Sequence, residues 1–108
     1  MTDLYNPHAG DILKEEFLLE LGLSQNALAR ALAVPANRIH AIVAGTRRIT
    51  ADTDLRLCRF FKMSEGYFLR LQNAHETLAA KRKLGETLQS IVPYSLTPPS
   101  SMGLNNRL

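Results

Sequence analysis

The stretch at residues 34–45, VPANRIHAIVAG, carries polar side chains that form directional hydrogen bonds: Asn37, Arg38 and His40. Asparagine can bond adenine through two hydrogen bonds, and arginine can bond guanine in the same way. Small side chains at Ala41 and Ala44 would let a helix bearing this face sink into the major groove of DNA. These residue types therefore suit the reading of base edges.

A helix over residues 36–44 would place this polar face opposite a buried one. Ile39, Ile42 and Val43 fall on one side at helical spacing, which predicts that this side is anchored in the core. Asn37, Ala41 and Ala44 then point away from the core. An ordinary solvated helix presents a polar face too, so the face alone does not decide between surface and recognition site.

The neighbouring residues favour recognition. Ser24 is a good N-cap for a helix over QNALARAL (25–32), whose inward positions are Leu28, Ala29 and Leu32. The connection AVPA (33–36) is tight, Pro35 suits the first turn of the next helix, and Gly45 is a natural stop. Two short helices joined in this way, the second bearing the exposed polar face, predict a helix-turn-helix.

Phosphate contacts are expected on both sides of the reading helix. Ser24 and Gln25 lie at a helix start, where free N–H groups and the helix dipole attract an anion. Arg47 and Arg48 follow the reading helix, where a sugar-phosphate backbone would run. Residues 21–64 carry seven basic and two acidic side chains, so the middle of the chain is the part suited to a polyanion.

The rest of the chain also reads as helix after helix, which predicts an all-α fold. A first helix is expected at residues 11–20, with Gly22 closing it. Thr50 caps a helix over 51–61, and Ser64 caps a longer one over 65–90 that packs Tyr67, Phe68, Leu71 and Leu78 on the bundle. We therefore expect one five-helix domain at residues 1–90 and a flexible tail at 91–108, rich in proline and serine.

Composition limits the class of protein. The 108 residues suffice for one core, no apolar run reaches the length of a membrane span, and the start lacks a secretory pattern, so we expect a cytoplasmic protein without membrane contact. The single cysteine, Cys58, lies among apolar residues and is expected to fill the core. The histidines His8, His40 and His75 have no metal-ligand spacing, and no carboxylate pair or phosphate loop occurs, so we expect no catalytic residue, metal or cofactor.

Residues 24–64 resemble the lambda-repressor-like (XRE-type) helix-turn-helix domain; their sequence is SQNALARALAVPANRIHAIVAGTRRITADTDLRLCRFFKMS. More narrowly, four stretches resemble addiction-module antitoxins of the HigA/VapI type: GDILKEEFL, PANRIHAIVAG, RRITADTDLRL and FLRLQNAHE. The resemblance covers about residues 7–80. It implies a five-helix DNA-binding domain, a homodimer on double-stranded DNA with an inverted-repeat operator, autorepression, and neutralisation of a cognate toxin of the RelE-like mRNA interferase kind.

By residue, the resemblance implies a base-reading face formed by Ala36, Asn37, Arg38, His40 and Ala41. It implies phosphate contacts from Ser24, Gln25, Thr46, Arg47 and Arg48. The family's loop is usually Lys-Arg-Gly at 46–48, so the number of phosphate contacts is open here. Ala33 replaces a glycine common in the turn, which strains the turn if that position needs a positive φ.

Other readings stay open at this stage. A regulator of the same fold without a toxin would carry the same residues, and a neighbouring gene for a small basic ribonuclease-like protein would decide between the two. A protein-interaction module that has kept the fold but lost DNA binding would be indifferent to salt and to changes at Asn37 and Arg38. A dimer seam is expected on the last helix around Leu78, Leu84 and Leu88.

Overall fold

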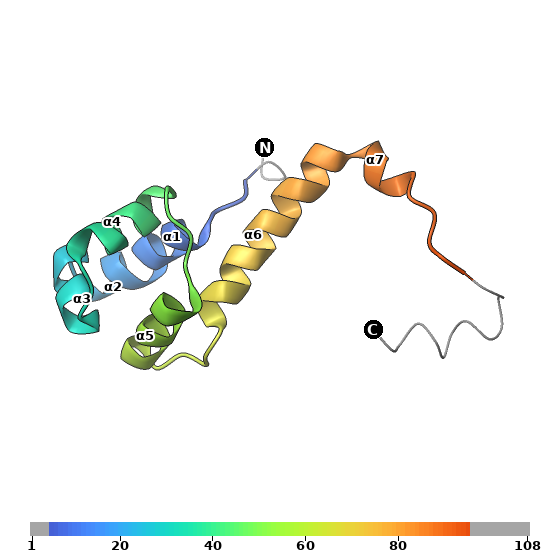
Figure 1. Ribbon diagram of the computed structural model, residues 1–108. Helices are drawn as coiled ribbons and strands as arrows, with labels where there is room; N and C mark the ends of the chain where they lie inside the picture. Colours follow the sequence, from blue (N-terminus) through green and yellow to red (C-terminus); the bar gives the residue numbers. More distant parts are fainter. Residues whose placement is uncertain (1–4, 96–108) are drawn as a thin grey trace.

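The computed structural model describes residues 5–95 and consists of helices joined by short connections (Figure 1). Its elements are α1 (Ala9–Ile12), the π-helical segment η2 (Leu13–Leu18), α2 (Leu19–Leu21), α3 (Gln25–Leu32), α4 (Ala36–Ala44), α5 (Ala51–Phe61), α6 (Tyr67–Leu84) and α7 (Glu86–Gln89). No β-strand occurs within residues 5–95, and the predicted all-α class is confirmed. Because α1, η2 and α2 are continuous, the described part forms six helices and not the five expected.

The first helix begins at Ala9, two residues before the expected start. His8 caps it, since its Nδ1 accepts hydrogen bonds from the backbone N–H groups of Gly10 (3.0 Å) and Asp11 (3.3 Å). The Asp11 carboxylate in turn accepts from the His8 backbone N–H at 3.1 Å, which completes a capping box. Histidine is not among the residue types that usually announce a helix start, so the pattern gave no sign of this cap. Gly22 ends the helix with φ 63°, as predicted.

Both short helices that follow have the predicted bounds. The Ser24 hydroxyl oxygen accepts from the Ala27 backbone N–H at 3.0 Å, and Gly45 ends α4 in the left-handed conformation with φ 84°. Pro35 lies one position earlier than expected: it is the extended N-cap of α4, with φ −61° and ψ 144°, and not part of the first turn. Its fixed φ suits either place, which is why the sequence did not separate them.

A buried aspartate, and not Ser64, caps the long helix α6. Thr50 caps α5 as predicted, but Ser64 does not cap the next helix, which begins at Tyr67 after Gly66. The Asp54 carboxylate, only 1% exposed, accepts from the backbone N–H groups of Gly66 (2.7 Å), Phe68 (2.9 Å) and Leu69 (3.1 Å). A negative charge at the positive end of the helix dipole satisfies N–H groups that would otherwise lack partners.

The expected helix over 65–90 is interrupted at Gly85, which has φ 52° and separates α6 from the short α7. Beyond α7, residues 91–95 have no regular structure and are exposed. The remainder of the predicted tail, 96–108, lies outside the described residues. The domain boundary at residue 90 stays a prediction.

The core lies where the first helix, α3, α4, α5 and the start of α6 meet. Its fully buried side chains include Leu13, Leu28, Ile39, Ile42, Leu57, Cys58 and Phe68. Tyr67 and Leu71 pack against this core as expected, whereas Leu78 is only half-buried and is not part of it. The later half of α6 extends away from α3, α4 and α5 and leads to α7 (Figure 1). Within residues 5–95 no helix has the length and apolarity to cross a membrane.

Candidate nucleic-acid interface

The helix-turn-helix is formed by α3, the turn at residues 33–35, and α4. Ala33 ends α3 with φ 60° and ψ 47°, the left-handed conformation that favours glycine. Its backbone N–H donates to the Arg30 carbonyl at 3.1 Å, and the Val34 N–H donates to the Ala29 carbonyl at 3.0 Å. These bonds satisfy the last carbonyls of α3 and set the direction of α4. Because Ala33 has a positive φ, the strain expected for a non-glycine residue at this position is present.

Helix α4 is anchored in the core as predicted. Ile39 and Ile42 are buried and Val43 packs against the core. On the opposite side, Ala36, Asn37 and Ala44 are exposed and Ala41 is half-buried. The Asn37 side chain makes no hydrogen bond within the described part of the chain, so its amide is available to an external partner.

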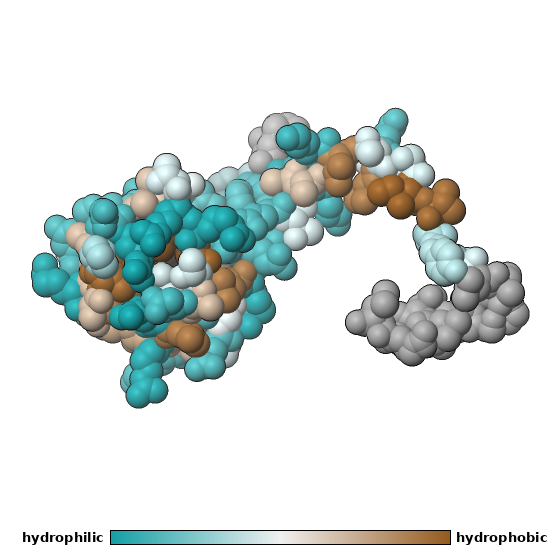
Figure 2. Space-filling model, viewed as in Figure 1, coloured by the Kyte–Doolittle hydropathy of each residue, from teal (hydrophilic) through white to brown (hydrophobic). Residues whose placement is uncertain are grey.

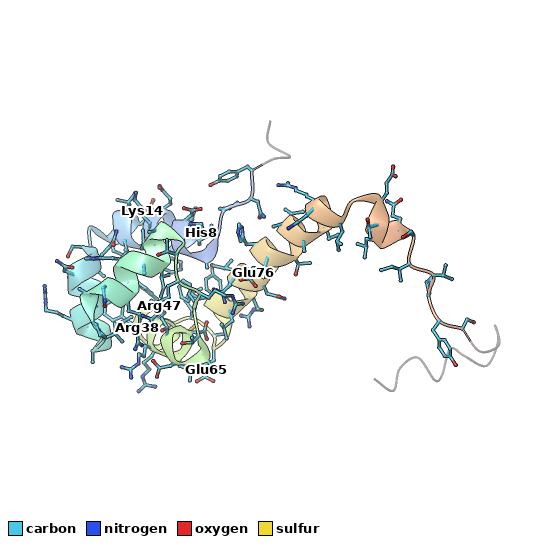
Figure 3. The ribbon with its side chains drawn as sticks, turned by 45° about the horizontal axis from the view of Figure 1, so that its top comes forward. His8, Lys14, Arg38, Arg47, Glu65 and Glu76 are labelled. Carbon is cyan, nitrogen blue, oxygen red and sulfur yellow. The ribbon has the colours of Figure 1, made fainter. Side chains whose placement is uncertain are left out.

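Arg38 does not extend into solvent. Its Nη1 donates to Oδ2 of Asp52 on α5 at 2.9 Å, and its side chain is 23% exposed (Figure 3). Arg56 donates to the same oxygen through Nε at 3.0 Å. The hydrogen bond from Arg56, followed by that from Arg38, lowers the pKa of the Asp52 carboxyl below its ordinary value.

His40 is joined to the preceding helix. Its Nε2 lies 2.9 Å from Oδ1 of Asn26, which fixes the ring at the edge of the α4 face. Ser24, Gln25, Asn26 and His40 line one shallow, open hollow on the surface. The Ser24 oxygen is occupied by the Ala27 N–H, so its hydroxyl hydrogen stays free to donate. The two expected phosphate contacts at the start of α3 thus lie beside one edge of the expected reading face.

The loop after α4 contains two arginines in different situations. Arg47 is exposed and has no ion pair or hydrogen bond within residues 5–95 (Figure 3). Arg48 instead pairs with Glu76 on α6 through two hydrogen bonds of 2.7 Å and 2.9 Å. The hydrogen bond raises the pKa of the Arg48 guanidinium and lowers that of the Glu76 carboxyl. Thr46 donates its hydroxyl to the Ala41 carbonyl at 3.3 Å, which closes the end of α4.

The side chain of Gln72 holds the backbone of the same loop. Its Oε1 accepts from the Ile49 N–H at 2.6 Å, and its Nε2 donates to the Ile49 carbonyl at 2.9 Å. Gln72 and Glu76 lie one turn apart on α6, so the loop that carries Arg47 is fixed at two neighbouring points.

The described residues contain no cluster of three or more histidine, cysteine, aspartate or glutamate side chains that could hold a metal ion. Cys58 is buried, and its thiol lies 3.6 Å from the Asp54 carboxylate. The arrangement on the α4 side is instead one of hydrogen-bond donors around an exposed helix. Such an arrangement can bind a duplex: donors to phosphate lie on both sides of side chains that can reach base edges.

Comparison with known proteins identifies the fold. A helix-turn-helix family model matches residues 13–68. The chain is 43% identical over 88 residues to Virulence-associated protein I of Dichelobacter nodosus, a match that spans 82% of this chain and 81% of that protein. Two solved structures each cover 84% of this chain and 100% of their own, with a TM-score of 0.76. They are Pseudomonas aeruginosa antitoxin HigA with the higBA promoter, 37% identical, and a HigA-family addiction module antidote protein from Coxiella burnetii, 41% identical. The chain belongs to the HigA/VapI family of helix-turn-helix proteins.

In this HigA/VapI-type protein, sequence reasoning identified the expected donors but missed the residues that hold them. The sequence pattern does not mark Asp52, Gln72 and Glu76 as parts of the site. Asp52 and Arg56 have the i, i+4 spacing of a helical ion pair, which was a usable signal. Gln72 and Glu76 lie 23 and 28 residues from their loop partners, and no local pattern reports such contacts.

Proposed function

We propose that this chain is the DNA-binding antitoxin of a type II toxin-antitoxin module, and that it binds its own operator as a homodimer and represses its own transcription. One observation carries the proposal: the exposed face of α4, with the amide of Asn37 free, lies between donors suited to phosphate. These donors are the Ser24 hydroxyl at the start of α3 and Arg47 after α4, which has no partner within residues 5–95. The relative from Pseudomonas aeruginosa, solved with the higBA promoter, supports the assignment.

In this proposal the side chains divide by role. Ala36, Asn37, Arg38, His40 and Ala41 form the surface that meets base edges, with Asn37 as the residue suited to adenine. Ser24, Gln25, Thr46, Arg47 and Arg48 contact or orient the backbone. Phosphate contacts set affinity and register, whereas contacts to base edges set sequence preference.

The test is fluorescence anisotropy on a duplex from the region upstream of the gene and on a scrambled duplex, each across a salt series. We expect tighter binding to the native duplex and an affinity that falls steeply as salt rises. Asn37→Ala should lower the preference for the native duplex by roughly 5- to 100-fold, because one bidentate base contact is lost.

Asn73→Ala serves as the matched control, because Asn73 is an exposed asparagine on α6 whose side chain makes no hydrogen bond to α4 within residues 5–95. This variant should bind as the parent does. If the parent shows no preference for the native duplex, or if both asparagine variants behave alike, the proposed role of α4 is wrong.

A homodimer would cover the apolar surface at the far end of α6. Leu84 and Leu88 are 43% and 41% exposed, and the exposed Ile91 and Val92 continue the apolar surface beyond α7 (Figure 2). Leu78, the third residue of the expected seam, is half-buried. Two copies related by a two-fold axis would bury this surface and place two α4 helices on two operator half-sites.

Sedimentation of the full chain at micromolar concentration tests the dimer. We expect a dimer for the parent and a shift towards monomer for Leu84→Asp/Leu88→Asp, since each charge would be buried in the seam. Lys83→Asp, a charge change in the same turn, should leave the dimer intact. A monomeric parent, with and without operator DNA, would refute the dimer.

The toxin partner is proposed from the family alone: a RelE-like mRNA interferase. Co-expression with the product of an adjacent gene for a small basic protein tests it, with growth rescue and co-purification as readouts. Absence of any such partner would leave a helix-turn-helix transcriptional regulator without a cognate toxin.

A further inference from the structure

The ion pair of Arg38 bears directly on how α4 would read DNA. Arg38 is the only arginine or lysine on α4, and it lies against the protein with its Nε buried and without a hydrogen-bond partner within residues 5–95. Its Nη1 is bonded to Asp52 at 2.9 Å. The bond to Asp52 uses one of the five N–H donors of the guanidinium, but this bond and the buried Nε hold the group against the protein, so it would have to move outward to present two donors to a guanine.

Asp52 can release Arg38 and bond it again without losing its other partner. Its side chain is 56% exposed, so it is not part of the core. Its Oδ2 accepts from both Arg38 and Arg56, and Arg56 also donates through Nη1 to the Leu32 carbonyl at 2.8 Å. When Arg38 leaves, Asp52 stays paired with Arg56, whose contact with the end of α3 keeps the turn in place. The exchange therefore leaves no unpaired carboxylate.

This pairing changes what different DNA sequences gain from Arg38. While Arg38 is hydrogen-bonded to Asp52, the carboxylate that it shares with Arg56 offsets part of its positive charge and weakens its attraction to phosphate. Release is favourable where the new partner replaces the carboxylate with acceptors of matching geometry, as O6 and N7 of guanine do. A base without these two acceptors does not compensate for the lost bond to Asp52. The Arg38–Asp52 ion pair therefore disfavours binding to DNA that lacks a guanine at this position.

We propose that Asp52 is a specificity-determining positioning residue, which holds Arg38 off the DNA until α4 meets a matching base. This inference rests on the proposed DNA-binding function. It requires that Asp52 acts through Arg38, and not through the stability of the fold. Asp52→Asn should therefore raise affinity for the scrambled duplex more than for the native duplex, and the ratio of the two affinities should fall roughly fivefold or more.

The experiment is a double-mutant cycle with four proteins: the parent, Asp52→Asn, Arg38→Ala and the double variant. Anisotropy on native and scrambled duplexes gives the affinity ratio and its salt dependence for each. In the parent background Asp52→Asn should also steepen the salt dependence on scrambled DNA by about one released ion, because a free cation is exposed. In the Arg38→Ala background Asp52→Asn should leave the affinity ratio unchanged, although its salt dependence still changes because Arg56 loses the same carboxylate.

Glu86→Gln is the matched control for net charge, since it removes one exposed carboxylate from α7, away from α4. It should leave the affinity ratio unchanged. Circular dichroism and thermal unfolding establish that each variant is folded. Arg56→Ala, which breaks the contact with the turn but leaves the Arg38–Asp52 bond, separates a loosened turn from a released arginine: it should retain the ratio.

The outcomes separate this inference from the proposed function. If the parent shows no sequence preference, the proposed function fails. If the parent discriminates but Asp52→Asn keeps the ratio, or lowers both affinities equally, Asp52 only supports the fold and the inference is wrong. If Asp52→Asn changed the affinity ratio equally with and without Arg38, the inference would also be overturned.

Discussion

Arg48 and Glu76 face each other in a two-point ion pair, with Nε–Oε2 at 2.7 Å and Nη2–Oε1 at 2.9 Å, which ties the loop after α4 to α6. The same helix extends away from the helix-turn-helix towards the proposed dimer surface (Figure 1). The loop that is expected to meet phosphate is thus joined directly to the element expected to meet the second copy.

This ion pair predicts a pH dependence of stability. The hydrogen bond from Arg48 lowers the pKa of Glu76, so in the folded protein Glu76 keeps its charge to a lower pH than in the unfolded chain. The stabilisation is therefore complete above the unfolded pKa, near 4.3, and is lost as the pH falls through the folded pKa. Glu76→Gln should unfold at a lower temperature than the parent at pH 7.

The measurement is thermal unfolding of both proteins from pH 7 to pH 2.5. The difference in Tm should shrink as the pH falls below about 4, since the parent loses the same charge there. Glu65→Gln, an exposed glutamate outside this pair, should show a smaller difference at pH 7. A gap between parent and Glu76→Gln that stays constant over the whole pH range would contradict the role given to the charge.

Ala33 offers a stabilising change. At φ 60° an alanine side chain is strained, and glycine relieves this strain at the cost of a more flexible unfolded chain. Ala33→Gly should raise the free energy of unfolding by about 0.5–1 kcal/mol. Ala31→Gly, two residues earlier and inside α3, should lower it by a similar amount. Denaturant titration of both variants decides, and a loss of stability in both would mean that the turn is not strained.

The buried carboxylate of Asp54 predicts a large loss. Asp54→Ala leaves three backbone N–H groups at the start of α6 without their acceptor, which should cost about 3 kcal/mol or more in the free energy of unfolding. Ser64→Ala, at the residue first expected to cap α6, should change it by less than about 0.5 kcal/mol. Equal effects at the two positions would refute the assignment of the cap to Asp54.

These caps show which parts of the fold were predictable. The helix-end residues Ser24, Thr50, Gly22 and Gly45 lie within four residues of the backbone groups that they pair with, so local pattern identified all of them. Asp54 caps a helix that starts 13 residues later, a contact that exists only once the chain has folded back. Local chemistry therefore predicted Ser64 in its place.

The candidate site shows the same division. Burial of Ile39 and Ile42, and exposure of Asn37, follow from helical spacing alone. The pairing of Arg38 with Asp52 and of Arg48 with Glu76 depends on how α4, α5 and α6 pack, which the periodicity of one helix does not determine. The sequence thus indicated which donors are present, and the packing determines which of them are free.

The two loop arginines should consequently differ in their effect on DNA binding. Arg47 has no intramolecular partner within residues 5–95, whereas Arg48 is neutralised by Glu76. Arg47→Ala should lower the slope of log affinity against log salt by about one, and Arg48→Ala by less. Lys83→Ala, which removes an equal charge from the last turn of α6, controls for net charge. Anisotropy on the native duplex across a salt series measures all three, and an Arg48→Ala effect as large as that of Arg47→Ala would show that Arg48 leaves Glu76 for the phosphate backbone.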